Sequence, residues 1–107
     1  MKTPYNKLVR DNIPQIVEDD GNIAITHVAG DEEYRQKLVE KLQEELNEFL
    51  ADGKDPSELA DMLEVIYAIC ELQGISREEL EEIRKKKEQK RGAFRKRIIL
   101  DQTDSKK

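Results

Sequence analysis

The sequence has few of the residues that characterise disulfide-linked, aromatic-rich or membrane-spanning proteins. It contains one cysteine, no tryptophan and 5% aromatic residues in 107 positions. The single thiol, Cys70, excludes an intrachain disulfide and suits a reducing compartment. No apolar run approaches the roughly 20 residues of a transmembrane helix, and residues 1–10 lack the apolar stretch of a signal peptide. We therefore expect a cytoplasmic protein that does not enter a membrane.

The sequence also has fewer basic than acidic residues. Lys and Arg number 19 against 24 Asp and Glu, which gives a formal net charge of −5. Such a balance argues against broad nucleic-acid binding. The basic residues concentrate between Arg84 and Arg97 and leave nucleic-acid binding open as an alternative, which the sparse aromatics disfavour. We expect no nucleic-acid partner.

The apolar residues recur with the period of a helix. Charged residues make up 40% of the chain and hydrophobic residues 36%, a balance typical of disorder unless the apolar positions are patterned. The pattern predicts an all-α, four-helix fold in a single domain over residues 1–107, with a frayed tail at 101–107. Because a monomer of this size buries a modest core, we expect a dimer or tetramer.

Capping residues and turns predict where the helices begin and end. A turn is predicted at 52–55. The β-branched stretch 23–28 is predicted as a strand or extended connector, and 97–100 as a second short strand. The predicted helices are a short one capped by Asp11 or Asn12 with Pro14 in its first turn and closed by Gly21, one over 32–51 capped by Asp31, one over 56–73 capped by Asp55, and one from the Ser76 and Glu79 capping box to about Arg91.

Two acidic clusters in tandem are the feature most informative about chemistry. The first is Glu44-Glu45-Leu46-Asn47-Glu48 and the second is Glu58-Leu59-Ala60-Asp61. Helical phase places Glu45 in the middle of an apolar stripe, Glu48 on its shoulder and Glu44 further round. Glu58 and Asp61 share an apolar face of the next helix.

Inward carboxylates repel one another and lose hydration, at a cost of several kcal/mol per ion, so a cation must compensate. Mg²⁺ prefers a few carboxylates together with water and phosphate oxygens. The same phase test places Lys87 and Arg91 on the apolar side of the last helix. An acidic metal site flanked by inward cations is suited to a polyphosphate.

These residues resemble a known family. The acids, the opening Tyr5-Asn6-Lys7-Leu8-Val9-Arg10-Asp11-Asn12-Ile13-Pro14 and the later Lys90-Arg91-Gly92-Ala93-Phe94 are similar to the small, single-domain branch of the MazG-like all-α nucleotide pyrophosphohydrolases. That superfamily includes dimeric dUTPases and phosphoribosyl-ATP pyrophosphohydrolase. The resemblance covers nearly the whole chain, although the stretch between the two acidic clusters is shorter than in many relatives.

The resemblance implies hydrolysis of a nucleoside triphosphate between its α and β phosphates, with Mg²⁺ or, as a substitute, Mn²⁺. Phosphoribosyl-ATP pyrophosphohydrolase of histidine biosynthesis is the alternative within the family. Family members form helical homodimers or dimers of dimers. The implied roles are metal ligation by Glu45, Glu48, Glu58 and Asp61, orientation or deprotonation of the attacking water by Glu44, and phosphate binding by Lys7, Arg10, Lys87 and Arg91.

Simpler interpretations exist for several of these residues. Glu58 could complete a capping box with Asp55, and Glu44 could lie on a solvated helix face. His27 lacks partners and is excluded from the site, while Cys70 is predicted as a core residue. A non-enzymatic helical assembly module would explain the helices, but it gives no reason for acids to face apolar neighbours.

Overall fold

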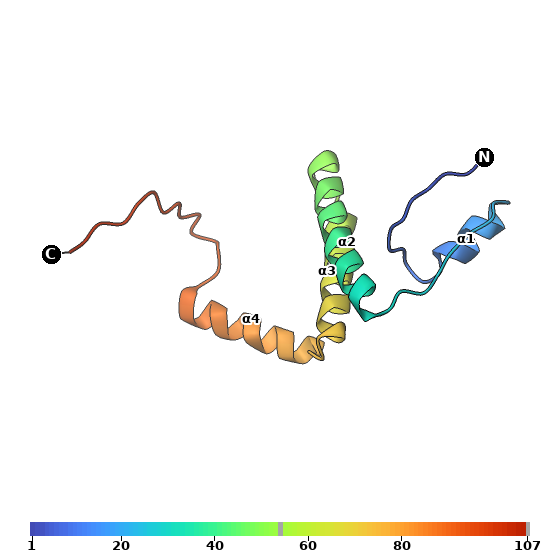
Figure 1. Cartoon of the computed structure of the whole chain (residues 1–107). Helices are drawn as coiled ribbons and strands as arrows, with labels where there is room; N and C mark the ends of the chain where they lie inside the picture. Colours follow the sequence, from blue (N-terminus) through green and yellow to red (C-terminus); the bar gives the residue numbers. More distant parts are fainter. Residues whose placement is uncertain (54, 107) are drawn as a thin grey trace. The chain divides into compact units, whose positions relative to one another are not determined.

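The computed structural model describes residues 1–53 and 55–106, and the regular secondary structure in them is all helical. Two compact units make up the chain, one from Met1 to Ile75 and one from Ser76 onward. The all-α prediction is confirmed, whereas a single domain over 1–107 and an oligomer stay predictions. Among the described residues, no helix combines the length and apolar character that crossing a bilayer requires. The helices are α1 (Ile13–Asp19), α2 (Asp31–Asp52), α3 (Pro56–Leu72) and α4 (Arg77–Arg91) (Figure 1).

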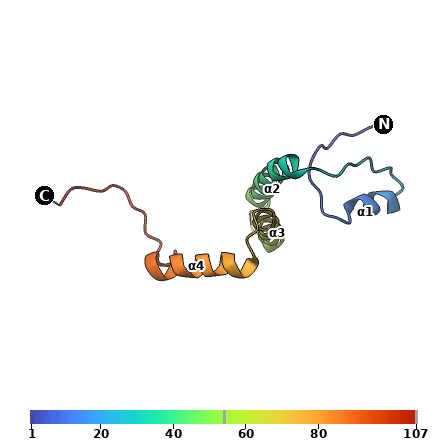
Figure 2. The ribbon, with the colours of Figure 1, turned by 60° about the horizontal axis from the view of Figure 1, so that its bottom comes forward.

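Helices α2 and α3 pack side by side and run in opposite directions, as both views show (Figures 1 and 2). Helix α2 ends at Gly53, whose φ of 74° is left-handed and favours glycine, and its N–H donates to the Phe49 carbonyl at 2.6 Å. Helix α3 begins at Pro56 after Asp55, whose carboxylate accepts the Ser57 N–H at 2.9 Å. The Asp55 cap is as predicted, and the predicted turn at 52–55 includes residue 54, which lies outside the described residues.

The start of α2 differs from the prediction by one residue. Gly30, rather than Asp31, is the N-cap, and Asp31 lies inside the first turn. The Gly30 carbonyl accepts the Tyr34 N–H at 2.8 Å, which is the first hydrogen bond of the helix, and because glycine has no side chain the helix begins without a side-chain cap. Acidic residues in the first turn instead interact favourably with the helix dipole.

The core of the described chain is small. Its buried hydrophobic residues are Leu38 of α2 and Val65 and Cys70 of α3, and the burial of Cys70 agrees with its predicted place in the core. Larger apolar side chains of the α2–α3 pair stay exposed. An exposed apolar face of this kind is typical of surfaces that bind another protein. These side chains are Val39, Leu46, Leu50, Leu59 and Leu63.

The prediction for α1 is confirmed, residues 23–28 follow the connector alternative of their prediction, and the predicted strand at 97–100 is wrong. Helix α1 follows its N-cap Asn12 and ends ahead of Gly21, although the Asn12 side chain makes no capping hydrogen bond. Residues 23–28 form a connector without a strand, and 97–100 form no strand either within the described residues. A strand needs a neighbour for its backbone groups, and these two stretches have none despite their β-branched sequence.

Helix α4 forms in the second unit and begins with the predicted capping box. The Glu79 N–H donates to Ser76 Oγ at 3.1 Å, and the Ser76 N–H donates to Glu79 Oε1 at 3.4 Å. No side chain of α4 is buried. Its charged residues pair along the helix instead, with the Arg84 guanidinium 2.6 Å from Glu81 and 2.7 Å from Glu88.

Candidate metal centre

Glu45 is a carboxylate buried in the apolar face of α2. It lies two turns after Leu38 and is 5% exposed. Its Oε1 lies 3.4 Å from Lys41 Nζ, and its Oε2 has no hydrogen-bond partner among the described residues. Loss of hydration and the negative charge of Glu48 raise the pKa of Glu45, although Lys41 opposes the shift. The predicted inward orientation of Glu45 is confirmed.

The first two turns of α3 bring two further carboxylates to Glu45. Glu58 and Asp61 are half-buried, and each offers an oxygen within 4.8 Å of the other and of a Glu45 oxygen. The Oε2 atom of Glu58 is also buried without a hydrogen-bond partner in the described chain. Loss of hydration, a hydrogen bond with Glu48 and the charges of Glu48 and Glu45 raise the pKa of Glu58 to about 7. The structure therefore brings together three of the predicted metal ligands.

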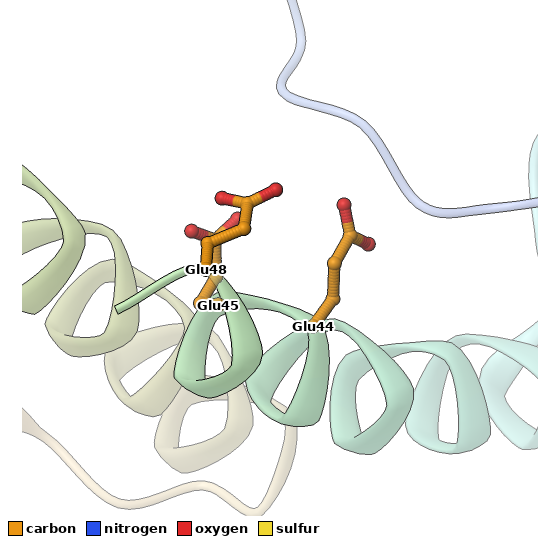
Figure 3. Close-up of side chains that lie close together, drawn as sticks. All are labelled: Glu44, Glu45 and Glu48. Atoms are coloured by element: carbon orange, nitrogen blue, oxygen red, sulfur yellow. The ribbon is translucent and has the colours of Figure 1, made fainter. Parts of the chain in front are cut away.

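Glu44 and Glu48 flank Glu45 on α2. Figure 3 shows the three side chains rising from the same side of the helix, with the carboxylates of Glu45 and Glu48 next to each other. One oxygen from each of the three lies within 4.8 Å of the others. Glu48 is exposed and Glu44 is half-buried, which is the reverse of the predicted order, in which Glu48 lies nearer the apolar stripe than Glu44. Glu48 is thus positioned to join the Glu45 group from the solvent side.

Cations from the N-terminal segment contact this acidic group. Lys7 Nζ donates to Glu44 Oε1 at 2.9 Å, and the Arg10 guanidinium donates to Asp61 Oδ1 at 2.6 Å. The hydrogen bond to Glu44 is the main cause that raises the pKa of Lys7. Both cations are predicted phosphate contacts, and the structure places each on a predicted site acid.

Lys41 belongs to the same cluster, although the sequence reasoning did not select it. Its Nζ lies 3.4 Å from both Glu44 Oε1 and Glu45 Oε1, and its side chain is 17% exposed. Partial burial opposes ionisation of Glu44, but the Lys7 hydrogen bond and the Lys41 charge outweigh this and lower the Glu44 pKa. The spacing of three and four residues was the available signal, since such side chains meet on a helix.

The other two predicted phosphate contacts, Lys87 and Arg91, lie on α4 in the second unit. Both are exposed, so the inward orientation that helical phase indicates is wrong for the single chain. The physical reason is that the described part of this unit contains no second helix on which α4 could pack. Their contact with phosphate stays a prediction.

A third group of acids at the start of α3 has a structural explanation. Asp52, Asp55 and Glu58 offer oxygens within 4.8 Å of one another, with Asp52 and Asp55 exposed. Asp55 caps α3, and the Ser57 backbone N–H lowers its pKa. Glu58 belongs to this group and also to the group with Glu45 and Asp61.

The donor set fits a hard divalent cation. Glu45, Glu58 and Asp61 supply only carboxylate oxygens, which Mg²⁺, Ca²⁺ and Mn²⁺ prefer over softer metals. Two of the oxygens, one on Glu45 and one on Glu58, are buried without a partner among the described residues. Buried anions in this state are costly unless a cation compensates them, so these residues could hold such an ion.

Comparison with protein-family models gives no match, and comparisons with curated proteins and with solved structures give none either. His27, which was excluded from the site, lies outside the acidic group, with its Nε2 3.0 Å from Glu33. The functional proposal therefore depends on the acidic group and on the cations around it.

Proposed function

We propose that this chain is a Mg²⁺-dependent nucleotide pyrophosphohydrolase of the MazG-like kind, which converts a nucleoside triphosphate to a monophosphate and pyrophosphate. The observation that carries the proposal is the buried Glu45 carboxylate, with an unpartnered oxygen, beside Glu58 and Asp61. A helical pair gains nothing in stability from burying such a group, whereas a metal site requires it. The proposed role is house-cleaning of the nucleotide pool.

A bound Mg²⁺ would supply charge neutralisation at the phosphate oxygens and would make water a better nucleophile. In the reaction, water adds to one phosphorus, the bridging P–O bond between the α and β phosphates breaks, and a proton is released. Glu45, Glu58 and Asp61, with Glu48 from the solvent side, would hold the metal. Mn²⁺ would substitute, since it takes similar oxygen ligands.

Glu44 is proposed to orient the attacking water. Its carboxylate is half-buried, accepts the Lys7 ammonium at 2.9 Å and lies 3.4 Å from Lys41. These two cations keep its pKa low, so Glu44 stays ionised near neutral pH. An ionised carboxylate accepts a hydrogen bond from water well, and its low pKa favours orientation of the water over uptake of the proton.

The phosphates are proposed to contact Lys7 and Arg10, which already lie at the acidic group, and Lys87 and Arg91 of α4. A homodimer or homotetramer would cover the exposed leucines of α2 and α3, and the free, buried Cys70 suits the reducing cytoplasm.

A substrate panel with Mg²⁺ tests the proposal. It would contain ribonucleoside, deoxyribonucleoside and modified triphosphates together with phosphoribosyl-ATP, and phosphorus NMR would resolve pyrophosphate from orthophosphate. We expect pyrophosphate as the first product and no turnover in EDTA. Preference for phosphoribosyl-ATP would identify the alternative within the family. Orthophosphate as the first product, or no turnover of any member of the panel, would overturn the proposal.

A further inference from the structure

Residues 5–10, here called the N-terminal strap, are attached to the α2–α3 pair through side-chain contacts. Lys7 pairs with Glu44 at 2.9 Å and Arg10 pairs with Asp61 at 2.6 Å. A third contact runs from Lys37 Nζ to the Asn6 carbonyl at 2.8 Å. The strap contains no helix or strand, so these contacts and the half-buried Leu8 and Val9 hold it in place.

The two ion pairs differ in whether their acid belongs to the three-carboxylate group. Asp61 belongs to the three-carboxylate group with Glu45 and Glu58, whereas Glu44 is held by Lys7 and Lys41. A divalent cation held by the three carboxylates would share Asp61 with the Arg10 guanidinium. The Arg10 pair is 57% and 35% exposed on its two sides, and pairs of that exposure are weak. The Arg10 end of the strap is therefore the end that a metal would displace.

We propose that the strap is a cation-exchangeable cover of the metal site: Arg10 occupies Asp61 without metal, leaves it when a divalent cation binds, and then becomes available to a phosphate group. Lys7 stays on Glu44 through this exchange, so the strap loosens at one end only. Metal would bind first and a polyphosphate second, because the first event frees a cation that the second one uses. This inference rests on the metal site of the proposed function.

If Arg10 exchanges in this way, replacing it should strengthen the binding of Mg²⁺ and weaken the binding of the nucleotide. Arg10 competes with metal for Asp61, so the Arg10→Gln variant should bind Mg²⁺ more tightly than the wild type, by about twofold to fivefold for an exposed pair. Arg10 also binds phosphate, so the same variant should bind a nucleotide analogue less tightly in saturating Mg²⁺. A guanidinium with a merely structural role would not tighten Mg²⁺ binding when it is removed.

The test uses the full chain, Mg²⁺ alone and a non-hydrolysable α,β-methylene nucleoside triphosphate. Calorimetry would measure the Kd of Mg²⁺, and hydrogen exchange would follow the Ile13 amide, which donates to the Arg10 carbonyl at 3.0 Å. We expect Mg²⁺ alone to speed exchange at the Arg10 end by about twofold to fivefold, and the analogue to slow it again. Arg10→Gln should exchange fast from the outset and should not respond to Mg²⁺.

The matched control is Arg35→Gln, which removes an exposed arginine of α2 that pairs with Glu32 at 3.6 Å rather than with a residue of the acidic group. It should keep the wild-type response to Mg²⁺. Unchanged exchange in the wild type with Mg²⁺ bound, together with an unaltered Mg²⁺ Kd in Arg10→Gln, would overturn the strap and leave the proposed function standing. Failure of the wild type to bind Mg²⁺ would overturn both.

Discussion

The α2–α3 pair and α4 are both rich in glutamate, but the two regions differ in how deeply their glutamates are buried and in how these pair with cations. Glu45 of α2 is 5% exposed, and one of its oxygens is unpartnered in the described chain. In α4 the acids remain exposed, and Glu81 and Glu88 both pair with Arg84 at successive turns. The hydrogen bond from Arg84 lowers the pKa of Glu81, whereas burial raises that of Glu45.

The difference follows from the packing of each helix, because α2 has an apolar face that packs on α3, whereas α4 is almost wholly polar and none of its side chains is buried. In α4 the charged residues sit three and four apart on the surface, where each pair adds a few tenths of a kcal/mol to the helix. In α2 Glu45 takes the place of an apolar residue on the packed face, where one of its oxygens lies 3.4 Å from Lys41 and the other has no hydrogen-bond partner among the described residues. An acid on a packed face therefore indicates a functional site, whereas an acid on an exposed face does not. Changes to the α2–α3 pair and to α4 should have correspondingly different effects.

The largest effect should come from neutralising the buried acid. We expect Glu45→Gln to lower Mg²⁺ affinity and activity by about 100-fold or more, since even supporting residues of metal sites contribute about 10-fold to 100-fold. The fold without metal should be as stable as the wild type or more so, because the amide keeps the shape and removes like-charge repulsion. Calorimetry with Mg²⁺ and thermal melting in EDTA would measure the two effects.

The control for that experiment is Glu64→Gln, which removes an exposed acid of α3 that is not one of the grouped carboxylates. It should leave Mg²⁺ affinity and the melting temperature close to wild type. A marked loss of metal-free stability in Glu45→Gln with an unchanged response to Mg²⁺ would show that Glu45 is a structural partner of Lys41 rather than a ligand.

The second-largest effect should be on self-association, which we expect to depend on the α2–α3 pair and not on α4. Leu59 and Leu63 are about half exposed and lie one turn apart on α3, so a second chain could cover them. We expect a mass of at least a dimer at micromolar concentration, and we expect Leu63→Lys to weaken association by tenfold or more, roughly the cost of exposing a buried leucine. Sedimentation equilibrium would measure both. Ile83→Lys on α4 is the comparison, and a monomeric wild type would contradict the prediction.

The effect of pH on stability should be smaller than the effects above and should arise in the α2–α3 pair. Glu45 and Glu58 have raised pKa values, the latter about 7, so the folded chain binds these protons more tightly than the unfolded chain does. Their contribution to the free energy of unfolding therefore falls as pH rises from about 4.5 through about 7. Because metal requires both carboxylates ionised, stabilisation by Mg²⁺ should be large at about pH 8 and small at about pH 5.5.

Thermal melting at the two pH values, with Mg²⁺ and with EDTA, checks this prediction. Glu58→Gln should flatten the pH dependence seen in EDTA. A stabilisation by Mg²⁺ that is equal at both pH values would mean that the ion binds elsewhere.

The smallest effect should come from α4. Ser76→Ala removes the hydroxyl that accepts the Glu79 N–H at 3.1 Å, and loss of such a cap costs about 1 kcal/mol. We expect faster hydrogen exchange in the first turn of α4 and an unchanged Kd for Mg²⁺. A change in Mg²⁺ affinity would show that the second unit contributes to the metal site.

Local rules predicted the helices well because each end has its own chemical signal. The Ser76 and Glu79 capping box and the Asp55 cap could be read from four-residue patterns. The strand at 97–100 was wrong, and 23–28 formed a connector rather than a strand, because β-branched residues form a strand only where another strand lies beside them, which no local pattern shows. The N-cap at Gly30 was missed because glycine has no capping side chain, whereas the neighbouring Asp31 is a typical capping residue.

The candidate site was predictable where helical period determines it. Helical period placed Glu45 inward and placed Glu58 and Asp61 on a shared apolar face of the next helix, and the structure brings the three together. The same period failed for Lys87, because an apolar stripe indicates burial only where a partner helix is present. The placement of Arg10 on Asp61, 51 residues along the chain, depends on tertiary structure and had no local signal beyond complementary charge.

The short connection between α2 and α3 has a consequence for how the protein folds. The five acids of the candidate metal centre all lie within one helical hairpin, so the contacts that bring them together join residues that are close in sequence. These acids are Glu44, Glu45, Glu48, Glu58 and Asp61. Helical hairpins of low contact order form on the microsecond to millisecond scale, much faster than structures built from distant segments. We therefore expect the acidic group to form early in folding, and a divalent cation at the proposed metal site would then favour the pairing of the two helices.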